Sequence, residues 1–207
     1  SYPFEGYMAD IWEATQQLGL QHMIFVGASL GGMIALPYIV QHQEQVEKLV
    51  LGDIGARLGG DQPNSYHQAM MDAPDYFDSL QEVEAWLRQW SLYVKIPSQG
   101  MAIILREHFW ETSDGRWTWT YLHKLREIRQ RQTAEKLFPT QWHVLSKIAC
   151  PVLIIRGGRS QSLFPDVAER TRSELPNASL VEIPDCAHFP YLEAPEEFTK
   201  ALRAFIG

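Results

Sequence analysis

The amino-acid sequence predicts an α/β fold, with helices on both faces of a parallel sheet. Short apolar runs alternate with longer segments of helical periodicity, an order typical of parallel strands joined by right-handed crossovers. The pentapeptide Gly-Ala-Ser-Leu-Gly at residues 27–31 lies where the first apolar run meets a helical segment. A tryptophan-rich stretch interrupts the alternation, which resumes after Pro151. These three observations indicate one α/β core that carries an insertion.

Four elements are predicted before the interruption. Residues 4–18 have the apolar spacing of a helix. The apolar run 23–26 predicts a buried strand, and residues 30–40 predict an apolar helix. Residues 48–53 predict a second short strand, which ends in an acidic side chain, Asp53.

The tryptophan-rich stretch, residues 59–145, predicts a helical cap inserted into the core. It holds six of the seven tryptophans, and it has no continuous run of β-branched residues. Each tryptophan there is expected to be either part of a hydrophobic core or part of the lining of an apolar pocket. The insertion divides the α/β core into residues 1–58 and 146–207.

Helices are expected inside the cap. Ser79 and Glu82 have the spacing of a capping box, and apolar residues recur behind them at helical intervals. Further helices are predicted at residues 101–110 and 121–130. The Ser-Asp-Gly sequence at 113–115 predicts a turn between those two helices.

The α/β alternation after Pro151 predicts four more elements. Residues 152–156, four apolar residues followed by Arg156, predict a strand, and residues 179–183 predict another. Residues 165–175 predict a helix with proline at its first position. Residues 195–206 predict a final helix with an apolar stripe.

Composition excludes several classes of function. The 207-residue chain has a net charge of −7 and no cluster of Lys and Arg, so we expect no nucleic-acid partner. No apolar run is long enough to cross a bilayer, and no secretory signal precedes the first element, so we expect no membrane association and a cytoplasmic location. Cys150 and Cys186 lack metal-ligand spacing, and two free thiols suit a reducing compartment, although a disulfide between them stays open. No ligand set for a metal or an organic cofactor is visible.

Ser29 is the candidate nucleophile. It lies on the turn between a predicted strand and a predicted helix, which is the arrangement of a nucleophile elbow. A serine hydroxyl is a poor nucleophile at neutral pH and needs an adjacent base, itself oriented by a third group. His188 is the leading base among seven histidines, because it follows the last predicted strand and sites in parallel sheets lie at the carboxyl ends of strands.

Three segments of the chain resemble the α/β-hydrolase fold family. They are Gly-Ala-Ser-Leu-Gly-Gly at 27–32, Pro-Val-Leu-Ile-Ile-Arg-Gly-Gly at 151–158 and Cys-Ala-His-Phe-Pro-Tyr-Leu-Glu at 186–193. The resemblance spans almost the whole chain. Within the family, the three segments look like those of the esterases, enol-lactonases and carbon–carbon bond hydrolases that carry a helical cap.

The resemblance implies a set of roles. Ser29 would be the nucleophile, His188 the general base, and the Leu30 N–H one donor of the oxyanion hole. An acyl-enzyme would form on Ser29 and would then be hydrolysed by water that His188 activates. The substrate would be a small carboxylic ester, a lactone or a related acyl compound. Serine at this position argues against the dehalogenase and epoxide hydrolase chemistries, which use aspartate.

The acid of the expected triad departs from the family pattern. In this branch the aspartate usually follows the strand that corresponds to 152–156, at a position that is Gln161 here. A glutamine supplies no negative charge to stabilise the imidazolium. Asp53 is the favoured substitute because it ends the preceding strand, and its plainer alternative is a turn residue. Asp166 and Asp185 are weaker candidates.

A second departure concerns the start of the chain. Family members usually carry further strands, and a loop with the second oxyanion donor, before the helix that opens this sequence. Without those N-terminal strands of the usual fold, the strand at 23–26 would be an exposed apolar edge. The chain is therefore expected to be either a fragment of a longer protein or a homo-oligomer that pairs this edge with another copy.

Three functions remain open at this point. The first is a serine hydrolase. The second is a catalytically impaired relative that binds a ligand or acts as a sensor, which would fit Gln161 and the missing strands. The third is a half-domain that works only when another chain complements it. Reactivity of Ser29 distinguishes the first from the others.

Overall fold

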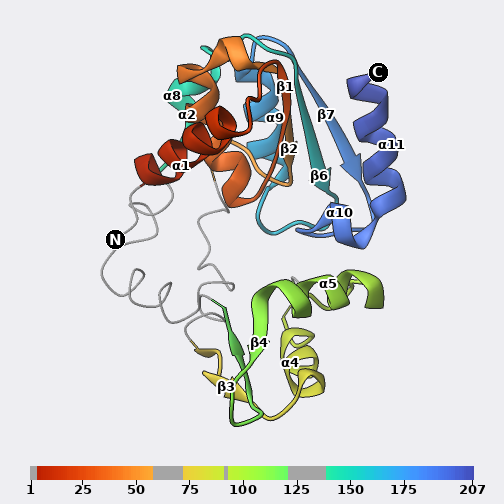
Figure 1. The fold of residues 1–207 in the computed structure, drawn as a ribbon. Helices are drawn as coiled ribbons and strands as arrows, with labels where there is room; N and C mark the ends of the chain where they lie inside the picture. Colours follow the sequence, from red (N-terminus) through yellow and green to blue (C-terminus); the bar gives the residue numbers. More distant parts are fainter. Residues whose placement is uncertain (1–3, 58–71, 91–92, 121–138) are drawn as a thin grey trace. The chain divides into compact units, whose positions relative to one another are not determined.

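The computed structural model describes residues 4–57, 72–90, 93–120 and 139–207. The chain divides into two compact units, the first formed by Ser1–Gly60 and Ala134–Gly207 and the second by Asp61–Thr133 (Figure 1). The first unit holds the α/β core. The sequence predicts an insertion that extends to residue 145, whereas Val144 and Leu145 are buried in the core of the first unit.

A four-stranded parallel sheet forms the centre of the first unit, as the alternation of elements predicts. Its strands, in spatial order, are β1 (Met23–Ala28), β2 (Val46–Gly52), β6 (Val152–Gly157) and β7 (Ala178–Ile183). The four strands run in the same direction, so the loops after them meet at one edge of the sheet. The candidate site residues follow these strands.

One face of the sheet packs against most of the helices. Leu49, Leu51 and Ile154 point to this face and are fully buried, because side chains alternate along a strand. The helices of this side are α1 (Phe4–Gln17), α2 (Leu30–Gln41), α8 (Trp142–Leu145) and α9 (Pro165–Glu174). A short 3₁₀ turn, η1 (Gln43–Gln45), joins α2 to β2.

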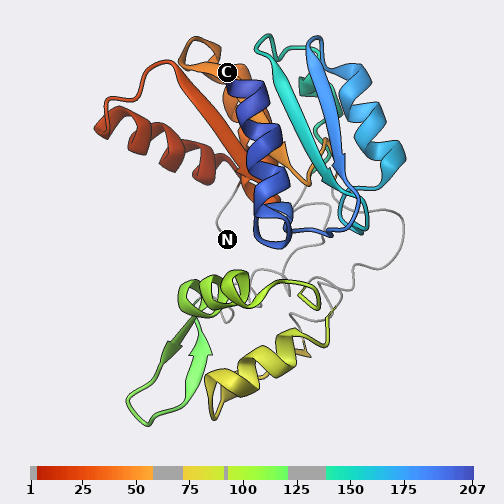
Figure 2. The same ribbon diagram turned by 90° about the vertical axis from the view of Figure 1, so that its right-hand side faces the viewer.

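The opposite face carries the C-terminal helices. Val50, Leu153 and Ile155 point to this side and pack with Phe198. Phe198 belongs to α11 (Pro195–Ile206), which follows the short helix α10 (Pro190–Glu193). Figure 2 shows α11 lying across the sheet on this side. Helices therefore cover both faces, as the fold class predicts.

The strand β1 is less buried than its sequence predicts. Ile24 is 39% exposed and Val26 is 48% exposed. Both lie on the same face as Val50, and β1 is the outermost strand of the described sheet. Its apolar side chains on that face are therefore open to solvent. Pairing of this edge with another copy of the chain stays a prediction.

The second unit combines helices with a small antiparallel sheet. Its described helices are α4 (Leu80–Leu87) and α5 (Ser98–His108), and its strands, in spatial order, are β3 (Tyr76–Phe77), β5 (Trp117–Trp119) and β4 (Phe109–Glu111). Ser79 caps α4 by accepting the Glu82 N–H at 3.2 Å, and the Glu82 carboxylate accepts the Asp78 N–H at 2.7 Å. The capping-box pattern therefore marks a helix start.

Aromatic side chains form the core of this second unit. The ring of Phe77 lies 6.0–6.4 Å from the rings of Trp86, Phe109 and Trp119. Trp119 is buried, whereas Trp110 is half exposed. Trp86 and Trp119 thus follow the plain expectation for tryptophan, which is to pack in a core.

The helix predicted at 101–110 is partly wrong. The helix α5 ends at His108, and residues 109–111 form a strand. The Ser-Asp-Gly turn at 113–115 closes a hairpin between β4 and β5, with Phe109 opposite Trp119. Aromatic side chains on both arms favour strand pairing over continuation of the helix. The helix predicted at 121–130 lies outside the described residues.

Candidate active site at the carboxyl ends of the parallel strands

Ser29 occupies the sharp turn between β1 and α2. Its backbone has φ 49° and ψ −121°, a left-handed region that few residues other than glycine adopt. Two features hold the turn. The Ser29 N–H donates to Gly52 O at 3.2 Å, and the Ser29 carbonyl accepts the N–H groups of Gly32 and Met33 at 3.1 Å. The helix α2 therefore begins immediately after the serine.

The turn depends on a close contact between Gly27 and Gly32. A Cβ atom added to Gly27 would lie 2.7 Å from Gly32 Cα, which is closer than real Cβ contacts allow. A Cβ atom added to Gly32 would lie 2.3 Å from a methyl carbon of Ile54. One at Gly31 would meet nothing within 4 Å. Packing therefore requires glycine at position 32 and does not require it at position 31, the second glycine of the pentapeptide.

Leu30 is the first residue of α2. Its N–H is therefore among those at a helix N-terminus that have no carbonyl partner within the helix. The partial positive charge of the helix N-terminus adds to the attraction for an anion. The position suits the oxyanion donor that the sequence predicts.

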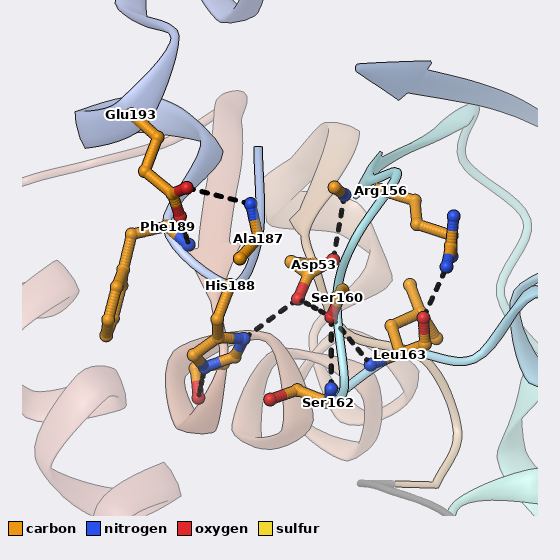
Figure 3. A network of polar contacts seen from close by, with 11 residues as sticks. Asp53, Arg156, Ser160, Ser162, Leu163, Ala187, His188, Phe189 and Glu193 are labelled. Atoms are coloured by element: carbon orange, nitrogen blue, oxygen red, sulfur yellow. Dashed lines mark hydrogen bonds and ion pairs between the residues drawn. The ribbon is translucent and has the colours of Figure 1, made fainter. Parts of the chain in front are cut away.

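His188 lies between Ser29 and Asp53. Its ring is buried, with Nε2 at 3.0 Å from Ser29 Oγ and Nδ1 at 2.8 Å from Asp53 Oδ2 (Figure 3). An ionised carboxylate only accepts hydrogen bonds, so Nδ1–H is the donor to Asp53. In the neutral ring with this tautomer, Nε2 accepts the hydroxyl hydrogen of Ser29. We refer to these three residues as the Ser-His-Asp chain.

Asp53 is completely buried, and both oxygens of its carboxylate accept hydrogen bonds. Besides His188, it accepts the Gly157 N–H on Oδ1 at 2.9 Å and the Ser160 hydroxyl on Oδ2. The Ser160 oxygen itself accepts the N–H groups of Ser162 and Leu163, each at 3.0 Å. Since those donors occupy the oxygen's lone pairs, the Ser160 hydroxyl hydrogen is directed at Asp53. A buried carboxylate needs such partners, because burial without them is costly.

The other acidic candidates do not reach His188. Asp166 and Asp185 are both exposed, as is Gln161. Asp185 contributes its backbone carbonyl, which accepts a hydrogen bond from Arg159. Among the acids that the sequence offers, Asp53 is the one whose carboxylate contacts the His188 ring.

Sequence reasoning missed the residues that hold the loop after β6. Arg156 is almost fully buried, donates from Nε to Leu163 O at 2.8 Å and forms an ion pair with Glu182. It thereby fixes the loop that carries Ser160. The position of Arg156 at the end of an apolar strand could have predicted this role, because a buried arginine needs hydrogen-bond acceptors.

Burial and nearby carboxylates raise the pKa of two groups beside the site. Burial, then the charges of Glu193 and Asp53, raise the pKa of the Cys186 thiol to about 12. Burial, then the Asp53 charge, raise the pKa of Tyr191 to about 12. Both groups are therefore neutral at physiological pH. The Cys186 thiol is also a poor candidate nucleophile, because the thiolate is the reactive form.

Two features are absent from the described residues. No three His, Cys, Asp or Glu side chains in ranges 4–57, 72–90, 93–120 and 139–207 are grouped so that they could hold a metal ion. Within the same part of the chain, no helix has the length and hydrophobicity needed to span a bilayer.

The fold and the Ser-His-Asp chain together define a class of protein. The family described as "alpha/beta hydrolase fold" matches residues 1–195. The chain belongs to the α/β-hydrolase fold family.

Curated relatives are similar over nearly the whole chain. The sn-1-specific diacylglycerol lipase ABHD11 of Mus musculus is 27% identical over 99% of this chain and 65% of its own length. The 3-hydroxybutyrate-oligomer hydrolase of Cupriavidus necator is 26% identical over 100% of this chain and 72% of its own length. The chain thus spans about two thirds of these relatives. Both are hydrolases, which supports a general hydrolytic function.

Solved structures share the fold. The crystal structure of E-2-(acetamidomethylene)succinate hydrolase superposes with a TM-score of 0.81 at 22% identity, over 100% of this chain and 74% of that one. An α/β hydrolase from Novosphingobium aromaticivorans gives a TM-score of 0.80 at 21% identity, over 98% and 72%.

Proposed function

We propose that the protein is a serine hydrolase that cleaves a small carboxylic ester, a lactone or a related acyl compound through an acyl-enzyme on Ser29. The observation that carries the proposal is the Ser-His-Asp chain, with 3.0 Å between Ser29 and His188 and 2.8 Å between His188 and Asp53. Nucleophile, base and orienting acid in hydrogen-bond contact are what acyl transfer by a serine needs.

The reaction would proceed in two halves. His188 Nε2 takes the hydroxyl proton while Ser29 Oγ attacks the substrate carbonyl, and the Leu30 N–H stabilises the oxyanion. The imidazolium then gives its proton to the leaving group, which leaves an acyl-enzyme. In the second half, His188 activates a water molecule that releases the acid. Asp53 stabilises the imidazolium in both halves without itself accepting the proton.

The contact of Asp53 with His188 weakens the case for a catalytically impaired binding or sensor protein. That alternative relied in part on Gln161 at the position where the acid usually lies, and in part on the missing N-terminal strands. If Asp53 supplies the negative charge beside His188, a glutamine at position 161 does not deprive the histidine of that charge. Relatives named as a lipase and an oligomer hydrolase also support turnover of an acyl substrate.

The test is covalent labelling combined with turnover. The protein is incubated with a fluorophosphonate probe, and hydrolysis of p-nitrophenyl esters and of a small lactone is measured in parallel. Labelling and turnover should both vanish in Ser29→Ala and fall by several orders of magnitude in His188→Ala. Ser173→Ala is the control, because this exposed serine lies on α9 and bonds only to the helix carbonyl of Arg170 among its described contacts.

A folded protein whose Ser29 takes no label and whose esters are not turned over would overturn the proposal. Relative rates on the ester and the lactone identify the preferred acyl class. Circular dichroism on each variant separates lost chemistry from lost folding.

A further inference from the structure

The carboxylate of Glu193 lies against the loop that carries His188. Glu193 is the last residue of α10. Its Oε2 accepts the Ala187 N–H at 2.9 Å, and its Oε1 accepts the Phe189 N–H at 3.1 Å (Figure 3). The two donors are the amides on either side of His188. One carboxylate therefore holds the backbone of the histidine from both sides.

The same loop is held on its carbonyl side by the segment after β6. Arg159 N–H donates to Cys186 O at 3.0 Å. The backbone at Ala187 approaches Gly157 so closely that a Cβ atom added there would lie within 2 Å of the Ala187 carbonyl oxygen. Hydrogen bonds donated to a charged acceptor are about twice as strong as those between neutral groups. Glu193 thus holds two backbone N–H groups of the His188 loop, whereas Arg159 and the contact at Gly157 hold its carbonyl groups.

We propose that Glu193 is a positioning residue for His188, acting through the two backbone amides that its carboxylate accepts. The inference rests on the proposed serine hydrolase function. Glu193 reaches neither Ser29 nor Asp53 by any described hydrogen bond, so its effect passes through the orientation of the His188 loop. The His188 ring contacts Asp53 at 2.8 Å and Ser29 at 3.0 Å at the same time. A rotation of the loop would disturb both contacts.

Loss of the two hydrogen bonds to Glu193 should lower kcat more than it changes KM. A misplacement of a catalytic group by 1 Å costs on the order of 100-fold in rate. We expect Glu193→Ala to lower kcat by roughly 10- to 100-fold while KM changes less than about threefold. Glu193→Gln retains one carbonyl oxygen for one of the two amides, so its kcat should lie between those of the alanine variant and the unaltered protein. This partial rescue is not expected from a loss of packing alone.

The decisive experiment is a double-mutant cycle with His188. The four proteins are the unaltered chain, Glu193→Ala, His188→Ala and the double variant, each assayed on the same p-nitrophenyl ester. If Glu193 acts through His188, the alanine at 193 lowers kcat in the unaltered background and leaves the residual rate of His188→Ala unchanged. Glu196→Ala is the matched control, because Glu196 is an exposed carboxylate three residues further along the chain.

Two outcomes would overturn the inference: an unchanged kcat in Glu193→Ala, or an equal fall in both backgrounds. If the alanine variant does not fold, the same cycle is run with Glu193→Gln, whose shape matches the original side chain. Failure of the proposed function is distinct, since it would show in the unaltered protein, as a Ser29 that takes no fluorophosphonate label and an ester that is not hydrolysed, or as full activity in His188→Ala.

Discussion

Ser29 and Asp53 both have a positive backbone φ, on turns that follow adjacent strands. Ser29 has φ 49° and Asp53 has φ 51°, and the Ser29 N–H donates to the carbonyl of Gly52, the residue before Asp53. Such conformations cost of order 1–3 kcal/mol each and persist only where the surrounding structure imposes them. Two of the three members of the Ser-His-Asp chain are thus held in costly conformations side by side.

Replacement of Asp53 by asparagine should abolish most turnover and leave the fold intact. Asparagine tolerates positive φ as well as aspartate does, so the turn should persist. The amide carries no charge for the imidazolium, and kcat should fall by about 10⁴-fold. The measurement is ester hydrolysis with a thermal melt of the same sample.

Asp185→Asn is the control for Asp53→Asn, because it neutralises an exposed carboxylate in the histidine loop. It should leave kcat within about twofold of the unaltered protein. A kcat for Asp53→Asn within tenfold of the unaltered value would contradict the assignment of the acid.

Removal of the Ser160 hydroxyl should weaken both the fold and the site. Ser160→Ala deprives Asp53 of one donor, and it leaves the amides of Ser162 and Leu163 without their acceptor. Buried donors without partners cost about 1–3 kcal/mol, so the free energy of unfolding in urea should drop by that amount. We expect kcat to fall roughly tenfold as Asp53 loses its orientation. Ser162→Ala, which keeps the amide that bonds Ser160, should change neither quantity appreciably; equal effects of the two variants would refute the role of Ser160.

The two glycines after Ser29 should respond differently to alanine. Gly32→Ala introduces a methyl group 2.3 Å from a methyl carbon of Ile54, which forces the elbow or the core to shift. Overpacking of this kind costs typically about 1–3 kcal/mol. Gly31→Ala meets open space inside a helix, where alanine is favoured over glycine, and should raise the free energy of unfolding in urea by up to about 1 kcal/mol. Equal stability of the two variants would show that the close contact at Gly32 is relaxed in solution.

Stability should fall in alkali through Cys186. Its folded pKa of about 12 lies above the ordinary thiol value, so the unfolded chain loses this proton first as pH rises. The contribution of Cys186 to the free energy of unfolding is fully present below the thiol pKa of the unfolded chain, and it is lost progressively as pH rises to about 12. Between pH 8 and 10 the loss should reach about 1 kcal/mol.

Cys186→Ser isolates this contribution, because serine keeps a donor for the Ile183 carbonyl and does not titrate in that range. The measurement is urea unfolding of both proteins at pH 8 and pH 10. An identical pH dependence for the two would exclude the thiol as the cause.

Local patterns predict most of the fold of the first unit. The apolar runs that begin at Met23 and Val152 are strands, and the segments that begin at Leu30 and Pro195 are helices. Ser29 and His188 are predictable as site residues because each follows a strand, and the carboxyl ends of parallel strands converge. Asp53 is predictable for the same reason.

The remaining features depend on contacts that sequence patterns do not record. Glu193 and Ser160 act through backbone amides and a hydroxyl, and neither has a residue type that signals this use. The need for glycine at Gly32 rather than Gly31 comes from the side chain of Ile54, which is distant in sequence. The β4–β5 hairpin is different, because aromatic residues around a Ser-Asp-Gly turn were a usable signal for strand pairing.

The Ser-His-Asp chain spans the whole width of the first unit's sheet. Ser29 follows the outermost strand β1 and His188 follows β7 at the other side, so their hydrogen bond joins residues 159 positions apart, and that of His188 with Asp53 spans 135. Closing such long loops is entropically costly and slow during folding. Ester hydrolysis should therefore be the last property to return on refolding, after helical circular dichroism has recovered.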